Sequence, residues 1–155
     1  MAHLPSQSLS EAFQAVLRRS SLSPDDQAPI LKALLPYAHA YEDLVKLLDL
    51  TKELMCIASL DGYFLWVNDA FERVLGHSRK ELLSRRFFDF VHPDDVEITR
   101  AKLEKLGSGL DVIRFENRYR TKDGGWRRLS WVCPAPAREG AEVYAIARDI
   151  TDEQP

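Results

Sequence analysis

Residues that build metal centres are scarce in this sequence, and no stretch of it is apolar enough to cross a bilayer. Cys56 and Cys133 are the only cysteines, and neither a Cys-x-x-Cys nor a His-x-x-x-His pair occurs, so the ligand spacing of a structural zinc site is missing. No apolar run approaches the roughly 20 residues of a membrane-spanning helix, and the N-terminus lacks the basic and apolar segments of a secretion signal. We therefore predict a cytoplasmic protein without a metal site or membrane span, whose two thiols are buried and reduced.

The charge balance and the loops exclude further classes of protein. Lys and Arg number 21 against 24 Asp and Glu, a formal net charge of −3, whereas domains that bind nucleic acid are usually strongly basic. No glycine-rich phosphate loop follows a strand-like segment, and no Ser or Cys stands on a sharp turn beside an identifiable base. We predict that this chain neither binds nucleic acid nor catalyses a reaction.

Residues 54–75 carry the clearest local signals. Asp61-Gly62 separates two short β-favouring segments and is typical of a tight hairpin turn, because Gly accepts a positive φ. Asn68 follows the second segment and precedes acidic residues, which is the pattern of a helix N-cap. We expect a strand, a turn, a second strand and then a helix, with the Asn68 side chain capping its first turn.

The rest of the chain divides into helices and a final group of strands. After a disordered tail at 1–8, helices are predicted at about 9–19 and from Ser23-Pro24 onward, where Pro36 is expected to kink or restart the helix. Gly76 is placed to end the helix that Asn68 begins. Capping signals predict a short helix after Ser78 and a longer one at 94–106. Period-two alternation predicts strands at 112–120, 126–134 and 142–150.

This order of elements indicates an α+β domain, with a five-stranded antiparallel sheet, helices on one face and further helices at the N-terminus. Alternation from Ile113 through Phe115, Asn117 and Tyr119 directs these side chains toward the helices. We predict that a helix at 31–50 covers the opposite face of the sheet, which would carry Val112, Val132, Tyr144 and Ile146.

Apolar residues recur along the segment 31–50 at steps of three and four. This seam consists of Leu31, Leu34, Ala38, Tyr41, Val45 and Leu48. It fits a dimerisation helix, an amphipathic helix packed on its own domain, or both at once if the helix covers the sheet and meets its twin across a two-fold axis. We predict a homodimer that forms through residues 9–50.

Six motifs, in order, resemble the PAS family of bacterial signalling proteins. They are D-G-x-F-x-x-V-N-D-A-F at 61–71, L-G-x-S-x-x-E-L at 75–82, H-P-D-D at 92–95, F-E-N-R-Y-R-T-K-D-G at 115–124, W-x-x-L-S-W at 126–131 and I-A-R-D-I-T at 146–151. The resemblance implies a PAS domain at 51–152, whose sheet and helices enclose a small cavity. Residues 9–50 would form a helical cap before it, and 153–155 would begin a linker to an output domain.

The resemblance also implies a sensory role. Such modules of histidine kinases and cyclic-di-GMP enzymes couple the state of a ligand or partner to a downstream output domain. The family's core usually joins a signalling helix at an Asp-Ile-Thr motif, here Asp149, Ile150 and Thr151. Cysteinyl-flavin photochemistry is disfavoured because Phe87 stands where light-sensing relatives carry cysteine. Haem is disfavoured because residues 94–106 contain no histidine, and His92 reads as part of a structural loop.

The side chains predicted to face the cavity are mostly apolar and aromatic. They are Phe71, Phe115, Asn117, Tyr119, Leu129, Trp131 and Cys133. The Asn117 amide could hydrogen-bond a ligand or satisfy a loop carbonyl. The rings could stack on a flavin or simply fill the core. The identity of any cofactor stays open, and so do three functions: a signal-coupling sensor, a flavin- or small-molecule-binding redox sensor, and a ligand-free protein-interaction module.

Overall fold

The computed structural model describes residues 9–136 and 142–153, so the predicted tail at 1–8 and the end of the predicted linker lie outside the described residues. The chain divides into two compact units between Leu50 and Thr51.

The first unit is a pair of helices, α1 (Leu9–Arg18) and α2 (Pro24–Leu50). The Ser23 hydroxyl caps α2 by accepting a hydrogen bond from the Asp26 N–H at 3.2 Å, and Glu42 Oε1 accepts one from the Ser10 N–H at 3.1 Å. Of the two outcomes predicted for Pro36, the restart is wrong, because α2 runs through it as one helix, and the kink stays a prediction. A proline inside a helix removes one N–H donor and its ring crowds the carbonyl four residues earlier, whereas the surrounding alanines and leucines have high helix propensities that favour continuation.

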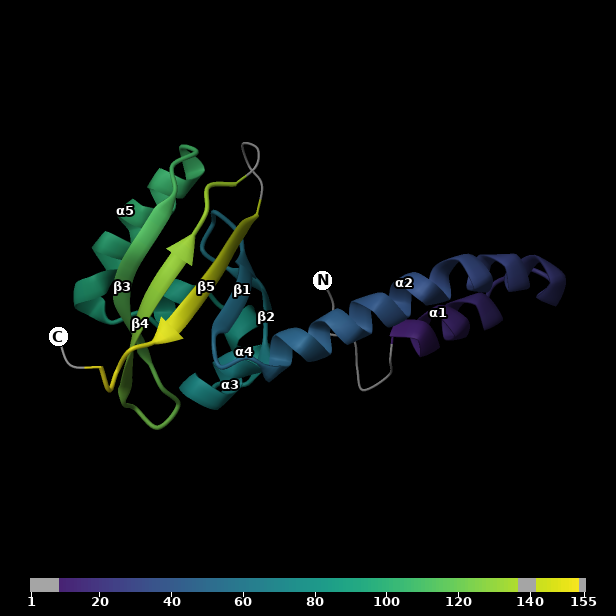
Figure 1. The fold of residues 1–155 in the computed structure, drawn as a ribbon, viewed down its shortest axis with the longest axis horizontal. Helices are drawn as coiled ribbons and strands as arrows, with labels where there is room; N and C mark the ends of the chain where they lie inside the picture. The colour runs from purple at the N-terminus through teal and green to yellow at the C-terminus, as the bar shows by residue number, and fades with distance from the viewer. Residues whose placement is uncertain (1–8, 137–141, 154–155) are drawn as a thin grey trace. The chain divides into compact units, whose positions relative to one another are not determined.

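The second unit contains a five-stranded antiparallel sheet in the order β2-β1-β5-β4-β3. Its strands are β1 (Leu54–Ala58), β2 (Phe64–Val67), β3 (Val112–Arg120), β4 (Trp126–Cys133) and β5 (Val143–Asp149). The segment between β2 and β3 forms helices α3 (Asp69–Leu75), α4 (Arg79–Ser84) and α5 (Val96–Gly107), with the 3₁₀ turns η1 (Phe87–Asp89) and η2 (Pro93–Asp95). Figure 1 shows α5 running behind β3, and the core lies between the helices and the sheet. The predicted α+β fold is confirmed.

Gly76 and Ser78 end and begin helices as predicted, whereas the Asn68 side chain has a role other than capping. Gly76 ends α3 in the left-handed conformation at φ 75°, and Ser78 forms a capping box with Glu81. Asn68 stands at the N-cap of α3 without a capping bond from its side chain. Its Oδ1 instead accepts the Met55 N–H at 2.9 Å, and its Nδ2 donates to the Glu53 carbonyl at 3.0 Å. The buried amide therefore joins the start of α3 to β1.

A bulge near the start of β3 reverses the alternation expected there. The register with β4 shifts between Ile113 and Phe115, and Arg114 between them has φ 54°. As a result Ile113 is 67% exposed, whereas Val112 is 4% exposed and faces the core. The predicted faces of these two residues were therefore wrong, because one extra residue in a strand moves everything before it to the other side.

The outer face of the sheet carries a row of apolar residues across four strands. The pairing register places Met55, Ile146, Val132 and Ile113 beside one another, and the last three are 47–67% exposed. Tyr144, on the same face of β5, is also exposed. Cover of this face by residues 31–50 stays a prediction.

Candidate functional site

A cavity of about 60 Å³ lies between the inner face of the sheet and α5. Its walls are almost entirely apolar, and they come from all five strands, from η1 and from one side of α5. The lining residues are Cys56, Ala58, Phe64, Phe87, Thr99, Lys102, Leu103, Leu106, Val112, Phe115, Asn117, Tyr119, Trp131, Cys133, Val143 and Ala145.

Most of the residues predicted to face a cavity are brought together there. Phe115, Asn117, Tyr119, Trp131 and Cys133 all line it. The other two are fully buried but lie outside its lining. Of these, Phe71 packs edge-on against Phe64, with ring centroids 5.2 Å apart, and so supports the wall from behind. Leu129 belongs to the same core. Whether any of the seven binds a ligand stays a prediction.

The seven residues predicted to face the cavity include none from α5, which contributes Thr99, Lys102, Leu103 and Leu106 to its lining. Thr99, Lys102 and Leu106 recur at steps of three and four, so they share one helix face. Lys102 was overlooked because its head group is charged. Its ammonium lies over the Phe115 ring, 5.8 Å from the centroid, an arrangement that lets the aliphatic stem border an apolar space.

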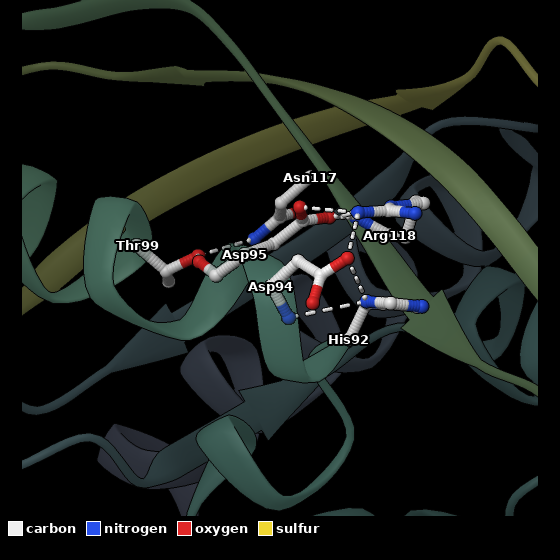
Figure 2. A network of polar contacts seen from close by, with 6 residues as sticks. All are labelled: His92, Asp94, Asp95, Thr99, Asn117 and Arg118. Carbon is white, nitrogen blue, oxygen red and sulfur yellow. Dashed lines mark hydrogen bonds and ion pairs between the residues drawn. The ribbon is translucent and has the colours of Figure 1, made fainter.

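The Asn117 amide connects the sheet to α5. Its Oδ1 accepts the Trp131 indole N–H at 2.8 Å, and its Nδ2 donates to Thr99 Oγ1 at 3.0 Å. The Thr99 hydroxyl donates in turn to the Asp95 carbonyl at 2.7 Å. Figure 2 shows Asn117 and Thr99 facing each other across this junction. Asn117 is 3% exposed, so its hydrogen bonds are made to the protein and the buried amide is satisfied without a ligand.

The neighbouring residue of β3 holds the same end of α5 from the other side of the strand. The Arg118 guanidinium donates to both oxygens of Asp95, at 2.9 and 2.7 Å, and its backbone N–H donates to the same carboxylate at 2.8 Å. These contacts lower the pKa of Asp95 below its ordinary value. His92 Nδ1 accepts the Asp94 N–H at 3.2 Å and so caps η2 (Figure 2). The His-Pro-Asp-Asp loop thus fastens α5 to the sheet.

Three weakly acidic groups share the cavity. Cys56 pairs with Ala145 on β5, and the register of β4 continues so that Cys133 flanks Ala145 on its other side. Burial raises the pKa of both thiols, that of Cys133 to about 11. Burial, together with the two nearby thiols, also raises the pKa of Tyr119. All three are therefore neutral at pH 7, and neither cysteine is activated as a nucleophile.

The end of β5 is tied to the beginning of β4. Asp149 accepts the Thr151 N–H at 3.0 Å and forms an ion pair with Arg127 at 3.6 Å. The Thr151 hydroxyl accepts the Arg128 N–H at 2.9 Å, and the Ile150 N–H donates to the Arg128 carbonyl at 2.8 Å. The predicted junction residues are therefore held to the strand that carries Trp131.

Two absences hold for the described part of the chain. Among residues 9–136 and 142–153, no three metal-ligating side chains come together. Within the same ranges, no helix combines the length and apolarity that crossing a bilayer requires.

With the fold and the cavity established, comparison with known proteins identifies the class. The family model described as PAS fold matches residues 64–146. The chain belongs to the PAS fold family, as its motifs predicted.

Individual relatives extend this result. Over 97 residues the chain is 30% identical to the Escherichia coli (strain K12) protein named "Probable diguanylate cyclase DgcE". The matched region covers 61% of this chain and 9% of that protein. The chain thus matches a small part of a much longer relative.

Two solved structures share the fold. A domain of a sensory box sensor histidine kinase/response regulator from Geobacter sulfurreducens has a TM-score of 0.60 at 23% identity, covering 75% of this chain and 96% of that one. The PAS domain of a Colwellia psychrerythraea protein has a TM-score of 0.62 at 21% identity, covering 74% and 99%.

Proposed function

We propose that this chain is a non-catalytic, cytoplasmic sensory module of a signal-transduction protein. In this proposal, changes in the cavity reach an output domain, of a histidine kinase or a cyclic-di-GMP enzyme, through Asp149, Ile150 and Thr151. Family membership and the similarity to part of a protein named as a diguanylate cyclase support the signalling role.

One observation supports the coupling step: β4 both lines the cavity and contacts the junction residues Asp149 and Thr151. Trp131 of β4 lines the cavity, while Arg127 and Arg128, at the start of the same strand, hold Asp149 and Thr151. A strand is stiff along its length, since each residue is fixed by hydrogen bonds to its neighbours. A displacement of Trp131 would therefore shift the groups that position the junction.

This coupling can be measured on the isolated chain. Ala145→Val adds two methyl groups to the cavity wall, and we expect it to change amide hydrogen exchange at Ile150 and Thr151 by severalfold. Tyr144→Phe, on the exposed face of the same strand, is the control and should leave both amides unchanged. Effects of Ala145→Val that stop at the cavity wall would contradict the coupling.

We further propose that two copies associate through α2, on a face shifted from the predicted seam. Ala38 is fully buried within the chain, and it lies one turn before Glu42, which contacts α1. Four seam residues are half-buried: Leu31, Leu34, Val45 and Leu48. The exposed apolar face of α2 instead consists of Tyr37, Tyr41, Leu44 and Leu47, which are 47–77% exposed.

Light scattering tests the dimer directly. The unmodified chain should elute at twice its monomer mass, and Leu44→Glu should convert it to monomer, because a charge at the centre of an apolar contact is costly to bury. Lys46→Glu is the matched control, since Lys46 is exposed and forms a surface ion pair with Asp43. A monomeric parent chain, or a dimer that survives Leu44→Glu, would refute this interface.

The flavin alternative has little support from the geometry. Pockets for drug-sized ligands and cofactors usually measure about 300–1,000 Å³, against about 60 Å³ here. The Asn117 amide, the group best suited to a flavin edge, is already bonded to Trp131 and Thr99. A flavin absorption band in freshly purified protein would reverse this conclusion.

A further inference from the structure

The cavity contains one strong hydrogen-bonding group that the protein leaves unused. Tyr119 is 2% exposed and lines the cavity, and no hydrogen bond joins its hydroxyl to any group in the described part of the chain. By contrast, the Asn117 amide and the Thr99 hydroxyl, which also border the space, both have protein partners. The Tyr119 hydroxyl is not among the fully enclosed atoms that lack a partner in the described chain, so it reaches the cavity space and is free to donate a hydrogen bond to a molecule bound there.

A single water molecule would fit this position poorly. An ordered buried water normally makes two to four hydrogen bonds. Among the described residues, the titratable groups that act on the Tyr119 hydroxyl are the thiols of Cys56 and Cys133, which are weak donors and acceptors. The surrounding walls are apolar. A molecule that offers one acceptor to Tyr119 and apolar surface to everything else satisfies the space better.

Size and charge restrict that molecule further. The cavity measures about 60 Å³, well below the roughly 150 Å³ of an engineered apolar cavity that admits benzene. Among the described lining residues Lys102 alone is charged, and its half-buried ammonium lies 5.8 Å from the centroid of the Phe115 ring. An ionic ligand would lose its hydration without gaining a fully buried counter-charge.

We propose, as a refinement that rests on the proposed sensory function, that the cavity binds a small uncharged molecule with one hydrogen-bond acceptor, such as a ketone, aldehyde or ether of three or four carbon atoms. The Tyr119 hydroxyl donates to the acceptor oxygen. The carbon atoms lie against the side chains around Ala145, between Cys56 and Cys133.

Three planar molecules of four non-hydrogen atoms test each part of this proposal: acetone, isobutene and acetate. Each is titrated into the ¹⁵N-labelled chain at pH 7, and the Trp131 indole N–H and the Asn117 side-chain amide report binding. Acetone and isobutene should give saturable shifts of these signals, whereas acetate should give none. Acetate binding as tight as that of acetone would overturn the uncharged class, and the absence of a saturable acetone shift would overturn the site.

Tyr119→Phe separates the hydrogen bond from apolar burial. A net hydrogen bond corresponds to roughly a fivefold to tenfold change in affinity, so the acetone-to-isobutene affinity ratio should fall by about that factor. Tyr144→Phe makes the same change on the exposed face of β5 and should leave the ratio unchanged. A ratio that survives Tyr119→Phe would refute the assigned acceptor contact.

Ala145→Val localises the ligand. By occupying part of the space it should abolish binding of acetone and isobutene alike, and binding that persists would place them elsewhere and refute the proposal. If Ala145→Val does not fold, the Tyr119→Phe ratio still decides the question. Failure of these titrations leaves the dimer and the coupling to Ile150 intact, since both are measured without any ligand.

Discussion

Replacing Asn117 by leucine tests the connection between the sheet and α5 most directly. Leucine has the same branching and the same number of side-chain heavy atoms as asparagine, and its larger methyl groups suit the apolar surroundings beside the cavity, so the substitution mainly removes two hydrogen bonds. The Thr99 hydroxyl keeps its bond to the Asp95 carbonyl. The Trp131 indole N–H, on a side chain that is 5% exposed, keeps no acceptor. Leaving a buried donor unsatisfied costs about 1–3 kcal/mol, and we therefore expect Asn117→Leu to lower the free energy of unfolding by about 2 kcal/mol.

Urea denaturation measures this loss. With a slope of about 2 kcal/mol per molar urea, the midpoint should fall by about 1 M while the slope stays constant. Glu116→Leu introduces the same residue one position earlier on β3, where the side chain is exposed and lies 3.7 Å from Arg128. Surface changes of this kind usually cost less than about 0.5–1 kcal/mol.

A double-mutant cycle identifies the cause of the loss. Trp131→Phe removes the stranded N–H, so the double variant should cost about 1–2 kcal/mol less than the sum of the single variants. Additive effects, within about 0.5 kcal/mol, would show that the indole N–H does not depend on Asn117. An Asn117→Leu variant as stable as the parent would refute the reasoning altogether.

Three other substitutions have defined outcomes. Serine is a good helix N-cap residue, but in Asn68→Ser its shorter side chain cannot bond both the Met55 N–H and the Glu53 carbonyl. Urea denaturation should therefore show a free energy of unfolding lower by about 2 kcal/mol, rather than by the few tenths expected when one cap residue replaces another. Asp95→Asn should flatten the acid side of the stability profile below about pH 5. Arg118 lowers the pKa of Asp95, so its stabilisation is present above the unfolded pKa of about 3.9 and is lost as pH falls through the lower folded value. Gly62→Ala should lower the melting temperature more than Gly124→Ala. Both glycines have φ near 90°, but only at Gly62 would a Cβ meet a ring of η1, at 2.7 Å.

The fold was predictable because the signals for its turns and helix ends are local. Gly76, the Ser78 capping box and the hairpin at Gly62 each depend on a few adjacent residues, and the structure has them where the pattern places them. Period-two alternation likewise found β3, β4 and β5. The position of Phe115 and Asn117 on the inner face followed from the same pattern.

The errors arose where distant residues decide the outcome. A single bulge at Arg114 exchanged the faces of Val112 and Ile113, and no short-range pattern announces it. Asn68 has the sequence pattern of a helix cap, but the backbone at β1 lies close enough to hydrogen-bond both ends of its amide. The sequence left the hydrogen-bond partner of Asn117 open because Thr99, which accepts from its amide, lies on another element 18 residues away.

Ala145, between the two cysteines, determines how the protein responds to oxidants. Neighbouring strands lie about 4.8 Å apart, so Cys56 and Cys133, two strands removed, have Cα atoms about 9–10 Å apart. A disulfide requires less than about 7 Å, and the backbone of β5 stands between them. Oxidation therefore cannot crosslink the sheet while it is folded, and the native protein should have the same melting temperature in oxidised and reduced glutathione.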